Sequence, residues 1–208
     1  MARGKAPTFE LQRAAILAEA AGLFADKGFH NASMSELAQA CGVSKPLLYH
    51  YYRDKEHILF DIADSYLDGL LAIVAGVDAQ ALAPEAHFAA LVTRFMEAYE
   101  HARSQHVVLV QDVKFLQQVQ AAQVTDKQRR VVAAFADAIV RIEPGLKRRK
   151  LDKPVTMILF GMINWTFTWL RADGSFTYRD MAPVVTTIFL NGVKGLVQGN
   201  QKKLVAAG

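Results

Sequence analysis

The chain has 208 residues, of which 52% are hydrophobic and 21% charged, a balance typical of a globular protein with enough apolar material for a core. Its single cysteine, Cys41, excludes a disulfide framework and a cysteine-based metal site within one chain, and favours a reducing, cytoplasmic compartment. The net charge of +4 permits contact with nucleic acid without predicting it. We expect neither a signal peptide nor a membrane span, because the longest apolar run is shorter than the roughly 20 residues that cross a bilayer.

Helices are predicted along nearly the whole chain. Apolar residues recur at helical spacing, whereas signals for hairpins and strands are weak, so we expect an all-α fold of about nine helices. Pro183 lies near the start of the last helix, where it predicts a kink or a delayed start. Long helices are expected over residues 9–27, 55–74, 85–103, 105–116, 118–142 and 155–170, and a last one from about 177 to 198. Residues 143–154 are expected to form a basic loop.

Two short helices are expected between the first and the fourth. Ser33 and Glu36 have the spacing of a capping box, and Gly42 ends the helix that follows. Ser44 can cap the next helix, which tolerates Pro46 in its first turn. Two short helices joined by a glycine-containing turn of about three to four residues form a helix-turn-helix pattern.

The second of these short helices carries hydrogen-bonding side chains where a packed helix would carry apolar ones. A helix of this size fits the major groove of B-DNA, which is about 12 Å wide. Lysine and tyrosine can bind phosphate, and residues near the helix start can reach base edges. Packing in the core is the alternative for the aromatic residues, and we expect it for Leu48 and for Tyr51 or Tyr52. The polar side chains in question are Ser44, Lys45, Tyr49, His50, Tyr52 and Arg53.

Basic residues outside this helix extend the candidate surface. Lys55 opens the fourth helix, and helix N-termini attract anions. Arg3 and Lys5 form a basic arm that could follow the DNA backbone or enter the minor groove. The first 57 residues hold seven Lys or Arg against six Asp or Glu, so only the local grouping supports DNA binding.

A long composite pattern covers residues 16–59. Its features are Leu23-Phe24 before Gly28-Phe29, the helix 33–40, Gly42-Val43-Ser44, Leu48-Tyr49 and Lys55-Glu56. The pattern resembles the N-terminal module of TetR-type (tetracycline-repressor-like) transcription regulators. The resemblance implies a DNA-binding domain over residues 1–53 and a ligand-binding and dimerisation domain over 54–208, joined by helix 54–75. It further implies a regulator that is not an enzyme, needs no cofactor and binds double-stranded operator DNA.

The same resemblance implies roles for single residues. Ser33 and Met34 would lie near the DNA backbone, Tyr49 and Lys55 would hold phosphates, and His50 would contact a base edge or a phosphate. Pro46 stands where many relatives have a small residue, which would change base preference at one position. The residues expected to face the groove are Ser44, Lys45, Pro46 and Leu47.

The C-terminal half is rich in Met, Phe and Trp, most of which we expect in the core. Asn164 and Asp112 interrupt apolar runs, and each needs a partner if buried, either a ligand or a structural hydrogen bond. The last two long helices are apolar on much of their surface, so with their copies they would form a homodimer interface. A helix-turn-helix protein needs such a dimer because its recognition helices must reach half-sites about 34 Å apart.

A second pattern covers residues 159–196, with Gly161, Asn164-Trp165, Trp169, Asp173-Gly174 and Gly192. It resembles the branch of TetR-type regulators that respond to acyl-CoA thioesters, and most of all the repressors of phenylacetate degradation. The resemblance implies a repressor released by an acyl-CoA, with phenylacetyl-CoA or a related aromatic or fatty acyl-CoA as effector. The residues expected at the effector are Phe95, Tyr99, Asp112, Phe115, Asn164, Trp165, Thr168 and Trp169, with Arg141 and Arg171 as cations for its phosphates.

Other functions stay open or are weaker. An efflux regulator that responds to a hydrophobic drug, or a DNA-binding protein without a ligand, would show the same helix-turn-helix pattern. Glu97 and His101 lie one helical turn apart, but a surface pair is more common than a metal site at this spacing, so no metal is expected. The sequence lacks a Gly-rich phosphate loop, a nucleophile elbow and a zincin histidine pair.

Overall fold

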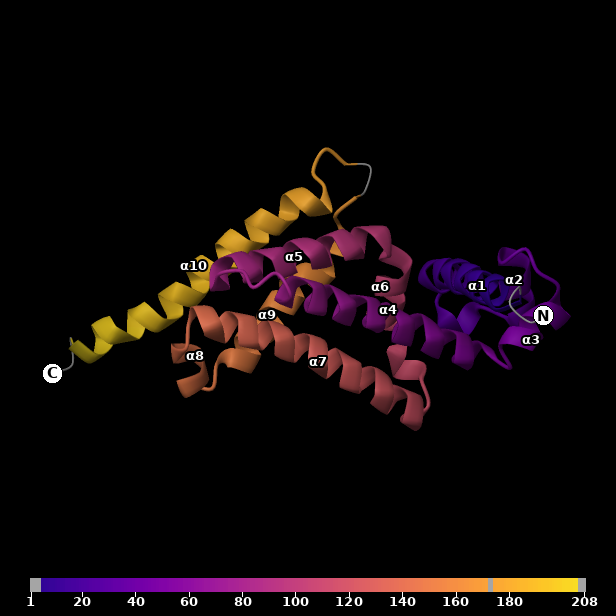
Figure 1. Ribbon diagram of the computed structural model, residues 1–208, viewed down its shortest axis with the longest axis horizontal. Helices are drawn as coiled ribbons and strands as arrows, with labels where there is room; N and C mark the ends of the chain where they lie inside the picture. Colours follow the sequence, from indigo (N-terminus) through magenta and orange to yellow (C-terminus); the bar gives the residue numbers. More distant parts are fainter. Residues whose placement is uncertain (1–4, 172–173, 206–208) are drawn as a thin grey trace. The chain divides into compact units, whose positions relative to one another are not determined.

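The computed structural model describes residues 5–171 and 174–205, and every regular element in these ranges is helical (Figure 1). This confirms the predicted all-α class. Within the same ranges, no helix combines the length and the apolar character needed to cross a membrane. The helices are α1 (Lys5–Lys27), η1 (Phe29–Asn31), α2 (Met34–Ala40), α3 (Lys45–Tyr51), α4 (Lys55–Asp78), α5 (Pro84–His101), α6 (Arg103–Gln111), η2 (Val113–Phe115), α7 (Gln118–Ile142), α8 (Gly145–Arg148), α9 (Asp152–Asn164), η3 (Trp165–Thr168) and α10 (Tyr178–Val205), where η marks a 3-10 helix.

The chain forms two compact units. Unit 1 comprises Met1–Gly69 and Ala102–Lys127, and unit 2 comprises Leu70–His101 and Gln128–Gly208. The N-terminal helices α1 to α3 therefore pack with the first part of α4, with α6 and with the start of α7, so unit 1 is larger than the predicted domain of residues 1–53. Helices α4 and α7 each contribute to both units.

Unit 1 is built around α1, which packs against both α2 and α6. Its buried face holds Ile16, Ala20 and Phe24, four residues apart along one side of the helix. Among the described residues of unit 1, three ion pairs reach α4. Arg13 binds the buried carboxylate of Asp61 at 2.6 Å, and Lys127 of α7 binds two further carboxylates of the same helix.

The helix-turn-helix forms from local sequence chemistry. The predicted capping box is present, since the Ser33 hydroxyl accepts from the Glu36 N–H and the Glu36 carboxylate accepts from the Ser33 N–H. Gly42 in the turn has a φ of 63°, a conformation that glycine adopts without steric cost. The Ser44 hydroxyl then caps α3 by accepting from the Leu47 N–H, as predicted.

Unit 2 has an aromatic core. The ring of Phe135 on α7 lies edge-on to Phe95 of α5 and to Phe160 of α9, at 4.8 Å and 5.1 Å between centroids. Helix α10 packs along α5, where Phe189 stacks on Phe88 at 5.4 Å (Figure 1). Edge-to-face and stacked rings stabilise such a core beyond the area they bury.

Three predicted elements differ from the structure. The helix expected over 155–170 ends at Asn164 and continues as η3, where the hydroxyls of Thr166 and Thr168 bond to carbonyls three residues earlier and compete with helical hydrogen bonds. The helix expected over 105–116 likewise ends in η2, and the basic loop contains α8.

The last helix opens close to the predicted residue 177, and of the two alternatives predicted at Pro183, a kink or a delayed start, the delayed start is wrong. Helix α10 begins at Tyr178 and continues through Pro183. The reason is a reciprocal cap, in which Asp180 accepts from the Thr177 N–H and the Thr177 hydroxyl accepts from the Asp180 N–H.

We predict that Glu36→Gln destabilises the fold in a pH-dependent way. Hydrogen bonds from Lys27 and Ser33 lower the pKa of the Glu36 carboxyl from 4.5 to about 2. Because this pKa lies below its unfolded value, the ionised carboxylate stabilises the fold above pH 4.5, and that contribution is lost as pH falls towards 2. In urea unfolding, the difference in free energy of unfolding between wild type and Glu36→Gln should therefore shrink as pH falls through this window.

The matched control is Glu85→Gln, which alters an exposed carboxylate in the first turn of α5. If the difference in free energy of unfolding between wild type and Glu36→Gln stays constant between neutral pH and pH about 2, the capping role is contradicted.

Candidate nucleic-acid interface and effector site

Helix α3 is divided into a buried and an exposed face. Leu48 and Tyr52 are buried, which confirms that they anchor the helix. Lys45, Tyr49 and His50 are exposed, and 47% of the Tyr49 surface remains accessible. The aromatic run thus separates by helical position, with Tyr49 and His50 outward and Tyr52 inward. Exposed with them are Ser44, Pro46 and Leu47, the remaining residues expected to face a groove.

Tyr51 belongs to neither the buried nor the fully exposed face of α3. Its half-buried ring stacks on Phe9 of α1, with centroids 4.5 Å apart and planes inclined by 22°. Phe9 also lies edge-on to His50 at 6.5 Å. The start of α1 therefore packs against the end of α3. Lys5 opens α1 but its side chain lies outside the described residues, and so does Arg3.

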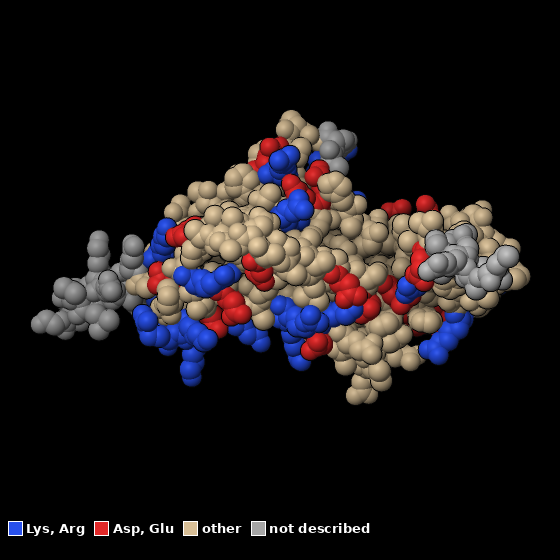
Figure 2. Space-filling model, in the orientation of Figure 1, with Lys and Arg blue, Asp and Glu red and all other residues tan. Residues whose placement is uncertain are grey.

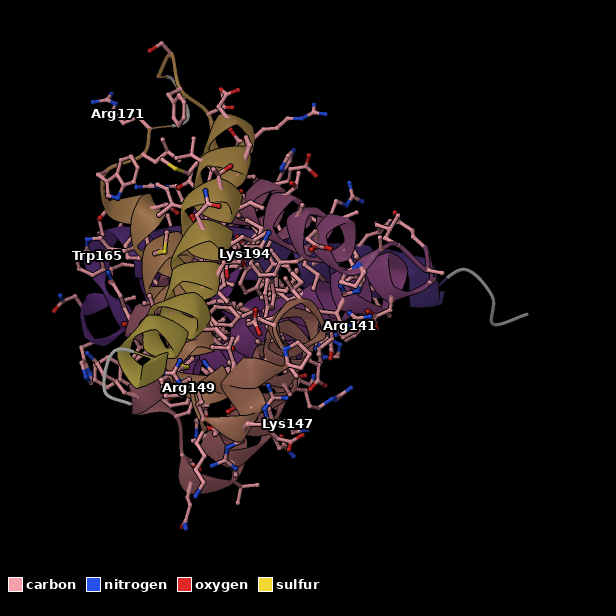
Figure 3. All side chains as sticks on the ribbon, turned by 90° about the vertical axis from the view of Figure 1, so that its left-hand side faces the viewer. Arg141, Lys147, Arg149, Trp165, Arg171 and Lys194 are labelled. Carbon is pink, nitrogen blue, oxygen red and sulfur yellow. The ribbon has the colours of Figure 1, made fainter. Side chains whose placement is uncertain are left out.

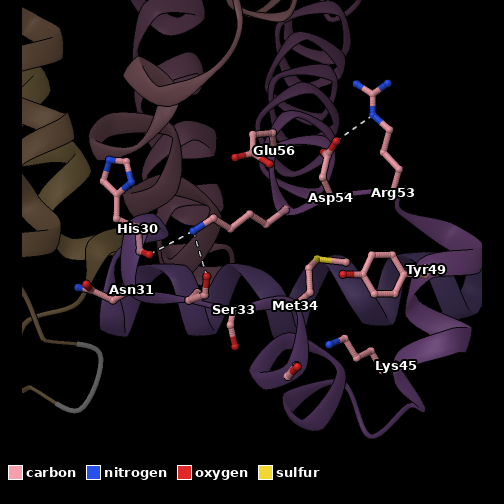
Figure 4. Close-up of a pocket in the computed structure, with 12 residues that line it drawn as sticks. His30, Asn31, Ser33, Met34, Lys45, Tyr49, Arg53, Asp54 and Glu56 are labelled. Carbon is pink, nitrogen blue, oxygen red and sulfur yellow. Dashed lines mark hydrogen bonds and ion pairs between the residues drawn. The ribbon is translucent and has the colours of Figure 1, made fainter.

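A hollow of about 550 Å³ lies where α2 begins and α3 gives way to α4 (Figure 4). The Arg53 guanidinium forms an ion pair with Asp54 at 2.9 Å on one side of it. Polar groups and a helix N-terminus around one hollow form a surface suited to an anionic backbone. The structure brings together here five residues that the sequence predicts to contact DNA: Ser33, Met34, Lys45, Tyr49 and Lys55.

Lys55 is engaged within the protein. Its ammonium donates to the carbonyls of Phe29, His30 and Ala32 at 2.9, 3.1 and 3.0 Å. A lysine ammonium has three protons to donate, and these three bonds use them all. A phosphate would have to displace one of these carbonyls, so the structure assigns Lys55 a role that the sequence did not predict.

Three of the predicted effector residues lie together in unit 2. The Tyr99 hydroxyl on α5 donates to the amide oxygen of Asn164 at the end of α9, at 2.9 Å. Phe95 lies edge-on to the Tyr99 ring at 6.1 Å. Burial raises the pKa of Tyr99, so the phenol stays protonated and remains a donor. The expected partner of Asn164 is therefore a protein side chain in this structure.

The tryptophans lie on the surface of this chain. Trp165 and Trp169 are 64% and 54% exposed, and Thr168 between them is exposed as well (Figure 3). Large apolar side chains at this exposure indicate a contact with another molecule more than a closed cavity within one chain.

The cations of unit 2 lie on different sides of it. Figure 3 shows Arg171 well separated from Lys147 and Arg149. The Arg149 guanidinium donates to the Leu196 carbonyl at 2.7 Å. Lysines and arginines gather around α8 and the turn after it (Figure 2). The exposed members of this group are Lys147, Arg148, Arg149, Lys150 and Lys153.

Arg141 and Asp78 are exposed, and both bind the buried imidazole of His87. The Arg141 guanidinium donates to Nδ1 of His87 at 2.8 Å, and Nε2 of His87 lies 2.6 Å from the Asp78 carboxylate. Because Nδ1 accepts, the imidazole proton resides on Nε2 and is donated to Asp78. The sequence analysis did not single out His87, although a histidine within the apolar pattern of α5 is a signal that a buried partner is required.

Asp112 and Phe115 lie in unit 1, against the connection between α1 and α2. The Phe115 ring stacks on Phe29 at 5.7 Å and lies edge-on to His30 at 4.0 Å. Asp112 is buried, and its burial raises the pKa of the carboxyl, an effect that the neighbouring Phe29 N–H partly opposes. Both residues were expected at the effector, and the structure instead places them beside the helix-turn-helix.

Two sequence families match this chain. Residues 16–62 match "Bacterial regulatory proteins, tetR family", and residues 81–193 match "Tetracyclin repressor-like, C-terminal domain". The chain belongs to the TetR family. Its curated and solved relatives are transcription regulators, in agreement with the exposed face of α3.

Individual relatives cover nearly the whole chain. The transcriptional repressor KstR2 of Mycobacterium tuberculosis is 25% identical over 186 residues, 88% of this chain and 92% of KstR2. A TetR-family regulator from Bordetella parapertussis is 36% identical with a TM-score of 0.82, over 86% of this chain and 93% of that one. AibR, solved with isovaleryl coenzyme A and operator DNA, shares the fold with 24% identity and a TM-score of 0.76, over 86% of this chain and 98% of AibR.

We predict that Tyr99→Phe lowers the free energy of unfolding by about 1 kcal/mol, because the hydroxyl that bonds to Asn164 is lost from a buried site. Tyr49→Phe makes the same chemical change at an exposed position and should leave stability unchanged. Urea unfolding of both variants tests this, and equal losses would show that the buried bond contributes nothing.

Proposed function

We propose that this TetR-family regulator is a dimeric repressor that binds a palindromic operator through α3 and is released by an acyl-CoA effector in a catabolic pathway. The observation that carries the proposal is the exposed face of α3, held outward by the burial of Leu48 and Tyr52 on the other face. A seven-residue helix fixed in this way can enter the major groove.

The exposed residues divide into backbone and base contacts. Lys45 and Tyr49 line the hollow with Ser33 and Met34, and suit phosphate oxygens. The remaining residues of the exposed face stand at the start and on the outer side of α3, where base edges would lie. These candidates for base contact are Ser44, Pro46, Leu47 and His50. Arg3 and Lys5 complete the proposal as a basic arm for the minor groove.

Dimerisation through α9 and α10 accounts for apolar side chains that one chain leaves exposed. Full burial of a large aliphatic side chain contributes about 1.5–3 kcal/mol, so a shared face of this kind would hold two copies together. Gly161 and Gly192 on the same helices are exposed and would allow close approach. The exposed large residues are Met157 and Ile158 on α9 and Val184, Ile188 and Leu196 on α10.

The effector is proposed to enter unit 2 near Tyr99, Asn164 and Phe95. The buried phenol of Tyr99 and the half-buried amide of Asn164, beside the Phe95 ring, offer polar groups in an apolar setting, as ligand sites commonly do. AibR shows that this fold can hold both an acyl-CoA and operator DNA. Phenylacetyl-CoA is the first candidate, with the basic residues around α8, Arg171, Trp165, Thr168 and Trp169 as candidate contacts for the nucleotide half. Arg141 already bonds to His87 and would have to leave it.

We predict that only CoA thioesters release the protein from DNA. Fluorescence anisotropy with the protein's own promoter should show dissociation with phenylacetyl-CoA and related thioesters, and none with phenylacetate, free CoA or cationic dyes. Release by dyes alone would replace the acyl-CoA with a hydrophobic drug. DNA binding that no compound alters would leave a ligand-independent DNA-binding protein, and activation of transcription by the bound protein would overturn repression.

We predict that Lys45→Ala weakens binding to all DNA sequences and flattens its salt dependence. Each lost phosphate contact lowers the slope of log K against log salt by about 0.9, hence by about 1.8 for the two protomers of a dimer. The matched control is Lys153→Ala, a change of the same kind at the start of α9 in unit 2. An unchanged slope for Lys45→Ala would remove this residue from the phosphate contacts.

A further inference from the structure

We propose that Phe115 and Asp112 are positioning residues for operator binding, which hold the α1–α2 connection (residues 28–33) together with Lys55. The inference rests on the proposed function, since it supposes operator DNA at α2 and α3. It assigns the α6–η2 segment to control of the DNA-binding surface.

The ring of Phe29 is the centre of this arrangement. Phe115 of η2 stacks on it with planes inclined by 16°, and Phe24 of α1 lies edge-on to it at 5.4 Å. The ammonium of Lys55, at the start of α4, lies 4.5 Å from the ring centroid. Three helices thus hold one buried ring, and the connection that carries the ring cannot shift without disturbing each of them.

The backbone of the connection is held by side chains as well. Three carbonyls between residues 29 and 32 are bound by Lys55, and the buried Asp112 carboxyl lies near the Phe29 N–H. Irregular backbone needs such partners because it has no helical ladder of its own.

The connection leads directly into the proposed interface. Ala32, whose carbonyl is bound by Lys55, precedes Ser33, the N-cap of α2. Ser33 and Met34 are proposed to face phosphates, so a displacement at Phe29 moves these groups relative to Lys45 and Tyr49 in the same hollow. Misplacement of about 1 Å is enough to lose a phosphate hydrogen bond.

The connection is not tightly packed against the α6–η2 segment. A cavity of about 470 Å³ lies between the connection and this segment, lined among others by Gly28, Asn31, Val110 and Gln111. Phe115 and Asp112 reach across at its margin.

Phe115→Ala tests the ring contact. We expect operator affinity to fall about tenfold, the equivalent of losing about one ring contact, with no change in salt slope because no phosphate contact is removed. Phe115→Tyr keeps the ring and should restore affinity, since the half-buried site leaves its hydroxyl a way to solvent. Val119→Ala, at an exposed position in the first turn of α7, is the control and should bind as wild type.

A second pair of variants remains informative if Phe115→Ala fails to fold. Asp112→Asn keeps an oxygen beside the Phe29 N–H and should retain affinity, whereas Asp112→Ala should weaken binding. Lys55→Ala should also weaken binding without altering the salt slope, in contrast to Lys45→Ala. A smaller slope for Lys55→Ala would make Lys55 a phosphate contact and overturn its positioning role.

The outcomes separate this inference from the proposed function. Circular dichroism establishes that each variant is folded at the temperature of the anisotropy assay. If wild type binds no promoter DNA, the proposed function fails. If wild type binds and Phe115→Ala binds equally well, or if Phe115→Tyr is as weak as Phe115→Ala, the proposed function stands and the positioning role is overturned.

Discussion

The DNA-binding surface depends on the burial of one face of a helix that is too short to be stable alone. An isolated helix of seven residues does not form in water, because nucleation costs more than so few hydrogen bonds return. Leu48 and Tyr52 supply the missing stability by packing in the core of unit 1. The same packing determines which residues face outward, so the recognition surface is a direct consequence of the core.

The parts of the fold that local chemistry determines could be predicted from the sequence. The capping box at Ser33 and the turn glycine at Gly42 act within four residues, so their patterns are visible in the chain. The placement of Asp112 and Phe115 could not be read in this way, because their partners lie some 80 residues earlier and no pattern encodes that pairing.

The partners of charged residues could not be predicted from the sequence either. Arg141 and Lys55 were both expected to hold phosphates, and in this structure Arg141 donates to His87 while Lys55 donates to backbone carbonyls. The sequence does not identify the acceptor that a lysine or arginine will bind, because carbonyls, imidazoles and phosphates all accept hydrogen bonds from it. The apolar residues of 157–169 were equally ambiguous. An apolar run predicts burial, but it does not say whether the covering surface belongs to the same chain or to a second copy.

The position of the tryptophans gives the molecule a built-in optical probe. The chain contains two tryptophans, and both lie within residues 165–169, largely exposed beside the apolar face of α9. Indole emission depends on hydration, so the intrinsic fluorescence of the unlabelled protein reports on this one segment of unit 2. Unit 1 contributes no tryptophan signal, which leaves events at the helix-turn-helix invisible unless they are transmitted to η3.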